Sequence, residues 1–365
     1  MMVFILFLYL CAAKITVLVV SAEDDFINVG NANGDSPLHY AVGMNEDFTK
    51  VLIDAGANVS VKNKKGDSPL HYAVANGYDV VKLLIDSGAD ANSKNNDGST
   101  PIFYVSEKDS DEICKLLMHS KIDVNERNAK NNTPLFHAAT TGNIKLLQCL
   151  IDNGGEVNVM NIYGDSPIIG ALSYGRGRAA QLLLDHGAHI DVKNKAGDIP
   201  LHLAARENNV ELAEIFLKAG AYVDAQNDNG NTPLHMAASN AAWNTTSLLI
   251  RYKANPNIKN NSNQSSLHLA SYNYSPAIAE ILISNGAMVN DVDYEGSTPL
   301  HIAANTNREN VAETLLRHGA NVNIKNKSGN TALHLALGSK NLKMVKLLIN
   351  LGSGNNLLNT NVTPV

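Results

Sequence analysis

The chain has 365 residues and a mass of 39.1 kDa, which is enough for two ordinary domains or for one extended array. Hydrophobic residues make up 44% and charged residues 18% of the chain, a balance that excludes a disordered polyelectrolyte and a protein with many membrane spans. The 29 Lys and Arg against 35 Asp and Glu give a net charge of −6. This charge argues against a general nucleic-acid binder, because phosphate contacts need a clustered positive surface.

The amino terminus is apolar. Residues 2–20 contain few polar side chains, and the run ends with small residues at Ser21-Ala22 before the acidic Glu23. This pattern predicts a secretory signal peptide over residues 1–22, cleaved after Ala22, and therefore an exported or secreted protein. No basic residue precedes the run and Lys14 interrupts it. An uncleaved membrane anchor remains the alternative, because the run is close to the roughly 20 residues that span a bilayer.

A short turn motif recurs along the rest of the chain. Its spacing is 32 residues twice and then 33 residues seven times, which defines ten units. Chance does not produce such regularity, so a repeat architecture is expected. Each unit opens with a residue suited to positive φ, which is Gly in eight units and Asn in two. These turn residues are Gly34, Gly66, Gly98, Asn131, Gly164, Gly197, Gly230, Asn263, Gly296 and Gly329.

Two helices are expected in each unit. Ser or Thr stands two residues after the turn residue in nine units, and Pro occupies the next position in eight units, which predicts the N-cap and first position of a first helix. An amphipathic second helix follows, as in VELAEIFLKAG, and is expected to end at a Gly in left-handed geometry. Lys121 and Lys253 take that place in two units. Each is expected to cost about 1 kcal/mol of stability relative to Gly, because a side chain disfavours left-handed geometry. The expected ends are Gly56, Gly88, Gly154, Gly187, Gly220, Gly286, Gly319 and Gly352.

This unit, with its TPLHxA signature at residues 232–237, resembles the ankyrin repeat. The resemblance covers residues 25–352 and implies an all-α solenoid, in which antiparallel helix pairs with projecting β-turn fingers stack into a curved array. It leaves residues 353–365 as a flexible tail. Ten repeats without a catalytic motif predict a non-catalytic scaffold for protein–protein interaction, without a cofactor, and we expect it to be a monomer. The alternative is a structural spacer that is tethered to a membrane by residues 1–22.

Seven histidines share one position in the repeat, so a metal site is one hypothesis for them. Stacked helices lie about 8–10 Å apart, whereas ligands sit about 2.0–2.1 Å from a zinc ion, so residues placed one per unit cannot converge on one metal. The resemblance implies instead that each His forms hydrogen bonds within its turn. These histidines are His39, His71, His202, His235, His268, His301 and His334.

No catalytic motif stands beside the repeats. The chain has no GxSxG, HExxH, phosphate-loop or dinucleotide fingerprint, and Asp35, Ser36 and His39 are interpreted as turn and cap residues rather than a hydrolase triad. A hidden hydrolase or transferase activity is the least favoured hypothesis, since no residues beyond the repeats remain to build its site.

The concave face is the expected binding surface, because stacked units leave it broad and exposed. In the ankyrin pattern the positions free to vary lie beside the turn residue and near the end of the first helix. Aromatic and Arg side chains are enriched in interface hot spots, although isolated exposed tyrosines are also common. The candidates for contact with a protein partner are Tyr163, Tyr174, Arg206, Tyr272 and Tyr294.

The fifth unit departs most from the pattern. Arg176 and Arg178 lie between its two helices, and we expect them either to contact an acidic partner or to lie in a solvated loop. The third and fourth units replace the motif His with Phe103 and Phe136. Units three to five are therefore either a softer joint or a specialised surface.

Three further residues are interpreted as buried. Cys114 and Cys149 are the one possible pair outside the amino-terminal segment, and each lies in an apolar helical stretch, which favours two small buried thiols. Trp243, the only tryptophan, is expected to pack inward in the second helix of the seventh unit.

Overall fold

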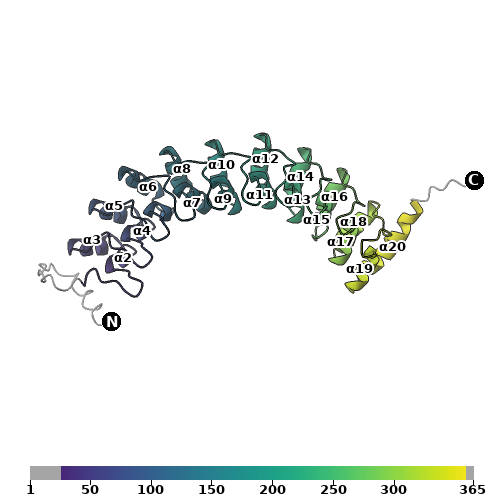
Figure 1. The fold of residues 1–365 in the computed structure, drawn as a ribbon, viewed down its shortest axis with the longest axis horizontal. Coiled ribbons are helices and arrows are strands. Elements are labelled where there is room, and N and C mark those ends of the chain that lie inside the picture. The colour runs from purple at the N-terminus through teal and green to yellow at the C-terminus, as the bar shows by residue number, and fades with distance from the viewer. Residues whose placement is uncertain (1–25, 359–365) are drawn as a thin grey trace, which may run out of the picture.

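The computed structural model describes residues 26–358. The predicted signal peptide and residues 359–365 lie outside this range. Ten helix pairs stack side by side into an arch, with no strand among the described residues. Figure 1 shows the first helices, such as α7, α9 and α11, along the inner side of the arch and the second helices, such as α8, α10 and α12, along the outer side.

The first helices are short, and each begins at the residue that follows the turn motif. Thr133 shows the predicted start, since its Oγ1 accepts the Phe136 N–H at 3.1 Å and Pro134 follows as the first helical residue. The first helices are α2 Pro37–Ala41, α4 Pro69–Ala73, α7 Pro134–Thr141, α9 Pro167–Ser173, α11 Pro200–Arg206, α13 Pro233–Ser239, α15 Ser266–Ala270, α17 Pro299–Asn305 and α19 Ala332–Gly338, and the 3₁₀ turn η2 Pro101–Tyr104 replaces the helix in unit three.

The second helices end as predicted in nine units. Seven of the expected glycines have φ between 83° and 92°, and Lys121 (φ 55°) and Lys253 (φ 68°) adopt the left-handed conformation that Gly takes elsewhere. The expected end at Gly352 is wrong, because the last helix continues through it to Leu358. The second helices are α3 Glu46–Asp54, α5 Tyr78–Asp86, α6 Ser110–His119, α8 Ile144–Asp152, α10 Gly177–Asp185, α12 Val210–Lys218, α14 Trp243–Arg251, α16 Pro276–Ser284, α18 Glu309–Arg317 and α20 Leu342–Leu358.

One elongated core runs the length of the array. The Leu or Ile that follows the turn motif is buried in units one to nine, from Leu38 to Leu300. Its counterpart in unit ten, Leu333, is only partly buried, because no further unit covers that end of the stack. Small residues such as Ala204 and Ala205 are fully covered and let neighbouring first helices approach closely.

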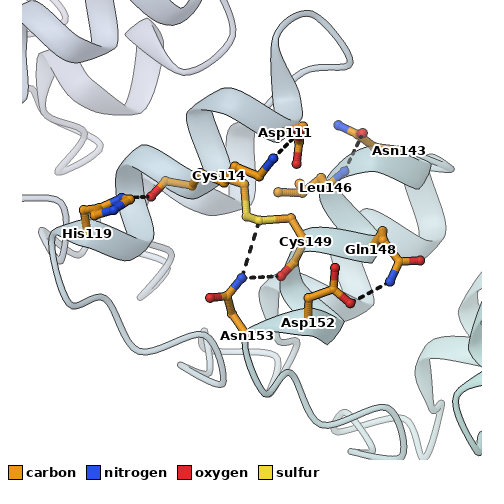
Figure 2. Close-up of a disulfide and its surroundings, with 10 residues drawn as sticks. Asp111, Cys114, His119, Asn143, Leu146, Gln148, Cys149, Asp152 and Asn153 are labelled. Carbon is orange, nitrogen blue, oxygen red and sulfur yellow. Dashed lines mark hydrogen bonds and ion pairs between the residues drawn. A yellow bond between two sulfur atoms is a disulfide. The ribbon is translucent and has the colours of Figure 1, made fainter.

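Cys114 and Cys149 form a disulfide, so the interpretation as two free thiols is wrong. The bond joins α6 of unit three to α8 of unit four, with their Cα atoms 6.5 Å apart (Figure 2). Cys114 lies 16 residues beyond its turn residue and Cys149 lies 18 beyond its own, so the two positions are not equivalent in the repeat. Their proximity therefore depends on how the two helices stack, which a repeat alignment does not show.

Unit three has the weakest first helix. Its four-residue η2 ends at Val105, which adopts an extended conformation (φ −62°, ψ 117°), and β-branched Val followed by Ser favours helix poorly. Phe103, in place of the motif His, offers no ring nitrogen to Thr100, whose side chain makes no cap hydrogen bond. The disulfide therefore links the unit with the shortest first helix to its neighbour.

Candidate protein-interaction surface

The β-turn fingers form a continuous ribbon along one edge of the array. The backbone N–H of each finger donates to a carbonyl of the preceding finger, as from Lys64 to Asn33 at 2.9 Å, from Asn96 to Lys65 at 2.9 Å and from Tyr294 to Ser262 at 3.2 Å. These bonds fix the spacing of the fingers. Side chains on the fingers are thus displayed in a regular row beside the first helices.

Four of the predicted tyrosines lie on the fingers or close to the ends of first helices. Tyr163 and Tyr294 lie on fingers and Tyr174 and Tyr272 lie just after first helices. All four are exposed, from 44% at Tyr272 to 65% at Tyr174. Lys195 Nζ lies 6.0 Å from the centre of the Tyr163 ring, so this ring has a cationic neighbour from the next finger. The candidates are spread over units five to nine rather than gathered at one spot.

Arg206 is less available than the tyrosines. Its side chain is about one-third exposed, and its Nε donates to Glu207 Oε1 at 3.2 Å. A partner carboxylate would have to compete with this neighbouring acid, so Arg206 is the weakest of the predicted contacts.

Three tyrosines that the sequence analysis did not select continue the aromatic surface toward the amino terminus. Tyr40, Tyr72 and Tyr104 each follow the motif His or its Phe replacement in units one to three. Their hydroxyls accept hydrogen bonds from the amides of Asn31 (2.7 Å), Asn63 (3.1 Å) and Asn95 (2.9 Å), respectively. The sequence could have indicated these tyrosines, because Tyr occupies the same repeat position in three successive units.

Trp243 is exposed, which corrects its expected place in the core. Its side chain is 49% exposed although α14 has a buried face formed by Thr245, Thr246, Leu248 and Leu249. At 100° per residue, Trp243 lies on nearly the opposite side of the helix from the centre of that face. The position of Trp243 on the helix therefore leaves it exposed, although its side chain is large and apolar.

The motif histidines connect successive units rather than forming a catalytic or metal site. His39 Nδ1 lies 2.9 Å from Ser36 Oγ in its own cap, and His39 Nε2 lies 3.0 Å from the Asp67 carbonyl oxygen in the next finger. His235 repeats this arrangement, with Nε2 3.0 Å from the Gln264 carbonyl. The bonds within the turn that the resemblance implied are present, and six of the seven rings also contact a backbone carbonyl of the next unit.

Burial fixes the charge state of these rings. It lowers the pKa of His235 and of His268 to about 4, and it also lowers the pKa of His71, His202 and His301. The rings are therefore neutral near pH 7, with Nδ1 accepting from the cap and Nε2–H donating to the next unit. Across residues 26–358, no three His, Cys, Asp or Glu side chains are grouped so that they could hold a metal ion.

Arg176 and Arg178 border a recess at the other end of the first helices. Arg176 is the N-cap residue of α10 and Arg178 belongs to its first turn. Both are exposed, and the recess between the loops of units four and five has a volume of about 570 Å³. The two side chains therefore lie at the opposite edge from the fingers that carry Tyr163 and Tyr294, whereas Tyr174 directly precedes the segment 175–179 that lines the recess.

Comparison with known proteins gives one clear match. The family model for ankyrin repeats (3 copies) matches in nine overlapping windows that extend from residue 8 to residue 361. The chain belongs to the ankyrin-repeat family. A comparison with curated proteins found no match.

Ankyrin repeats are generally modules for protein–protein interaction and are typically non-catalytic. The ten units of this ankyrin array share the fold that the resemblance implied. None of the helices among residues 26–358 is long and apolar enough to cross a membrane.

Proposed function

We propose that this ankyrin array is an exported, non-catalytic scaffold that binds a protein partner through its concave face. The row of exposed tyrosines along that face supports the proposal. Tyrosine supplies a large contact area at a low entropic cost and carries a polar group for orientation, which is why it is enriched among interface hot spots. The hydrogen-bonded fingers position Tyr163 and Tyr294 before a partner binds, which reduces the cost of ordering them.

A binding experiment with matched variants tests the face. The full chain is immobilised and exposed to proteins of the surrounding medium, and the captured proteins are quantified by mass spectrometry. We expect the triple variant Y163A/Y174A/Y272A to lose most of the capture. The control Y222A/Y274A removes two tyrosines that are 69% and 74% exposed and lie outside the predicted set, and it is expected to bind like the parent. Equal capture by the triple variant and the parent would contradict the proposed face.

The disulfide supports export. Disulfides persist in oxidising compartments and are rare where glutathione keeps thiols reduced, and Cys114–Cys149 is bonded. The mass of the mature amino terminus tests this part of the proposal. A chain that starts at Glu23 supports release after cleavage, whereas retention of Met1 or Met2 supports the tethered spacer.

A further inference from the structure

A recess at the loop edge of units three to five is distinct from the concave face. We call it the loop recess and define it by Glu107, residues 141–145 and residues 175–179, which line its volume of about 570 Å³. It lies where first helices end and second helices begin, whereas the fingers precede the first helices. A volume of this size falls in the range of small-ligand pockets, roughly 300–1,000 Å³, so it has room for a few side chains of a partner.

The loop recess carries unpaired positive charge. Lys145, Arg176 and Arg178 line it, and none of them forms an ion pair with a carboxylate of the described chain. Glu107 is the one acidic side chain in its lining.

Cations elsewhere in the array are often neutralised within their own helix. Lys82 pairs with Asp86 at 2.6 Å and Lys115 pairs with Asp111 at 2.6 Å, both four residues away. The same spacing on α8 places Gln148 and Cys149 near Lys145, and on α10 it places Leu182 near Arg178. The sequence therefore provides no intrahelical carboxylate for the cations of the loop recess.

The walls of the loop recess are held in place by specific bonds. Arg176 Nε donates to the Thr140 carbonyl oxygen at 3.2 Å. The Arg176 side chain passes close to Gly142 (φ 81°), and a Cβ at this position would lie only 3.0 Å from Arg176 Cδ. The absence of a side chain at Gly142 therefore leaves room for the arginine. Asn143 is 3% exposed and donates to the Ser106 carbonyl at 3.0 Å, which joins the loop of unit four to unit three.

The disulfide adds a covalent constraint beside the same walls. It joins α6, which follows Glu107 closely, to α8, which carries Lys145 (Figure 2). The spacing between the walls that unit three and unit four contribute is therefore restricted by a covalent bond as well as by packing. A fixed arrangement of this kind favours binding, because less order has to be imposed when a ligand arrives.

We propose that the loop recess binds a carboxylate-rich peptide segment of the protein partner. This inference rests on the proposed function of the array and specifies the chemistry of one part of that partner. Guanidinium groups match carboxylates in planar, two-bond geometry, and three unpaired cations in one recess are complementary to several acidic side chains.

Fluorescence anisotropy tests the loop recess directly. The probe is a fluorescein-labelled peptide of four Gly-Glu pairs, and the Gly-Gln peptide of the same length is its uncharged counterpart. We expect the Glu peptide to bind the full chain more tightly than the Gln peptide and to be weakened by added salt. K145Q/R178Q is expected to reduce the affinity for the Glu peptide at least about fivefold, because two exposed charge pairs are lost.

A charge-matched control separates the recess from the overall charge of the protein. Lys50 and Arg127 are exposed cations outside the recess, so K50Q/R127Q changes the net charge by the same amount and is expected to bind like the parent. Carbodiimide coupling should join the Glu peptide to Lys145 rather than to Lys50. Equal binding of the two peptides, equal affinity of the two double variants, or full displacement of the peptide by inorganic phosphate at the same ionic strength would overturn the proposal.

A variant of the concave face separates the test of the loop recess from the test of the proposed function. Y163A/Y272A omits Tyr174, which directly precedes Gly175 in the recess lining. It leaves the lining of the loop recess unchanged and is expected to keep its affinity for the Glu peptide. Loss of partner capture in that variant with retained peptide binding supports both proposals. Retained partner capture with peptide binding that depends on Lys145 and Arg178 overturns the concave face alone.

Discussion

The motif histidines make the array sensitive to acid. The pKa of His235 and His268 is lowered to about 4 by burial, whereas a histidine in the unfolded chain titrates near pH 6.5. Between these values the unfolded chain binds more protons than the folded chain, so stability is fully present above about pH 6.5 and is lost as the pH falls toward 4. Each of the two rings contributes about 3 kcal/mol to this loss once the pH is below 4.

Thermal unfolding followed by circular dichroism checks this dependence. We expect the melting temperature to fall steadily between pH 7 and pH 5. The H235Q variant should be less stable than the parent at pH 7, because the bonds to Thr232 and Gln264 are altered, and it should lose less stability on acidification. A melting temperature that is constant from pH 7 to pH 5 would show that the rings are not protonated on unfolding.

A buried serine in unit five lost its partner when the motif His was replaced. The Ser166 hydroxyl is buried and makes no hydrogen bond, because Ile169 stands where other units have His. In unit two, by contrast, Ser68 Oγ lies 2.9 Å from His71 Nδ1. We expect S166A to raise the free energy of unfolding by about 1 kcal/mol and S68A to lower it by about 1 kcal/mol.

Urea unfolding of the two alanine variants beside the parent measures this difference. The two serines have the same position in the repeat and are both buried, so S68A is a close control for S166A. Destabilisation of similar size in both variants would mean that Ser166 has a partner in solution.

At the scale of helices, the repeat period predicted almost every boundary. Turn glycines, caps and the left-handed Lys121 and Lys253 follow from the backbone preferences of single residues, which the sequence displays directly. The disulfide and the exposed side of Trp243 depend on how one helix faces another, and alignment of the units does not contain that information. The continuation of α20 through Gly352 was not predicted, because Gly ends the second helix in seven other units.

The concave tyrosines were only partly predictable for a similar reason. Tyr163 and Tyr174 stand at positions that vary in the family, so a position rule finds them. Tyr40 and Tyr72 occupy a position inside the first helix that carries the buried Leu203 or Ile302 in later units, so the exposure of Tyr40 becomes clear only in the folded array. The loop recess was anticipated through Arg176 and Arg178, whereas the contribution of Lys145 required the stacking of unit four on unit five.

The disulfide between α6 and α8 is expected to stabilise the array. It closes a loop with a sequence separation of 35 residues, for which loss of chain entropy in the unfolded state gives about 3–4 kcal/mol. We expect C114A/C149A to melt at a lower temperature than the oxidised parent. Dithiothreitol should lower the melting temperature of the parent and leave that of the variant unchanged. An unchanged melting temperature in the parent, with both thiols alkylated after reduction, would contradict a stabilising role.

Across the whole molecule, stability depends on contacts between neighbouring units, because no unit buries its apolar face alone. Unit three has the shortest first helix, because four residues of η2 take its place, and the disulfide joins that unit to unit four. At least about three stacked repeats are needed for a stable array. Units one and two therefore depend on unit three for their connection to the longer remainder of the array.

Reduction of the disulfide should consequently open the amino-terminal end of the array as a group. Hydrogen–deuterium exchange with mass spectrometry should show faster exchange in α2 to α6 after dithiothreitol, while α11 to α18 keep their protection. The C114A/C149A variant should show the same fast exchange with or without dithiothreitol. Faster exchange spread evenly over all ten units would contradict a weak point at unit three, since it would mean that the array opens as one cooperative block whether or not α6 and α8 are joined.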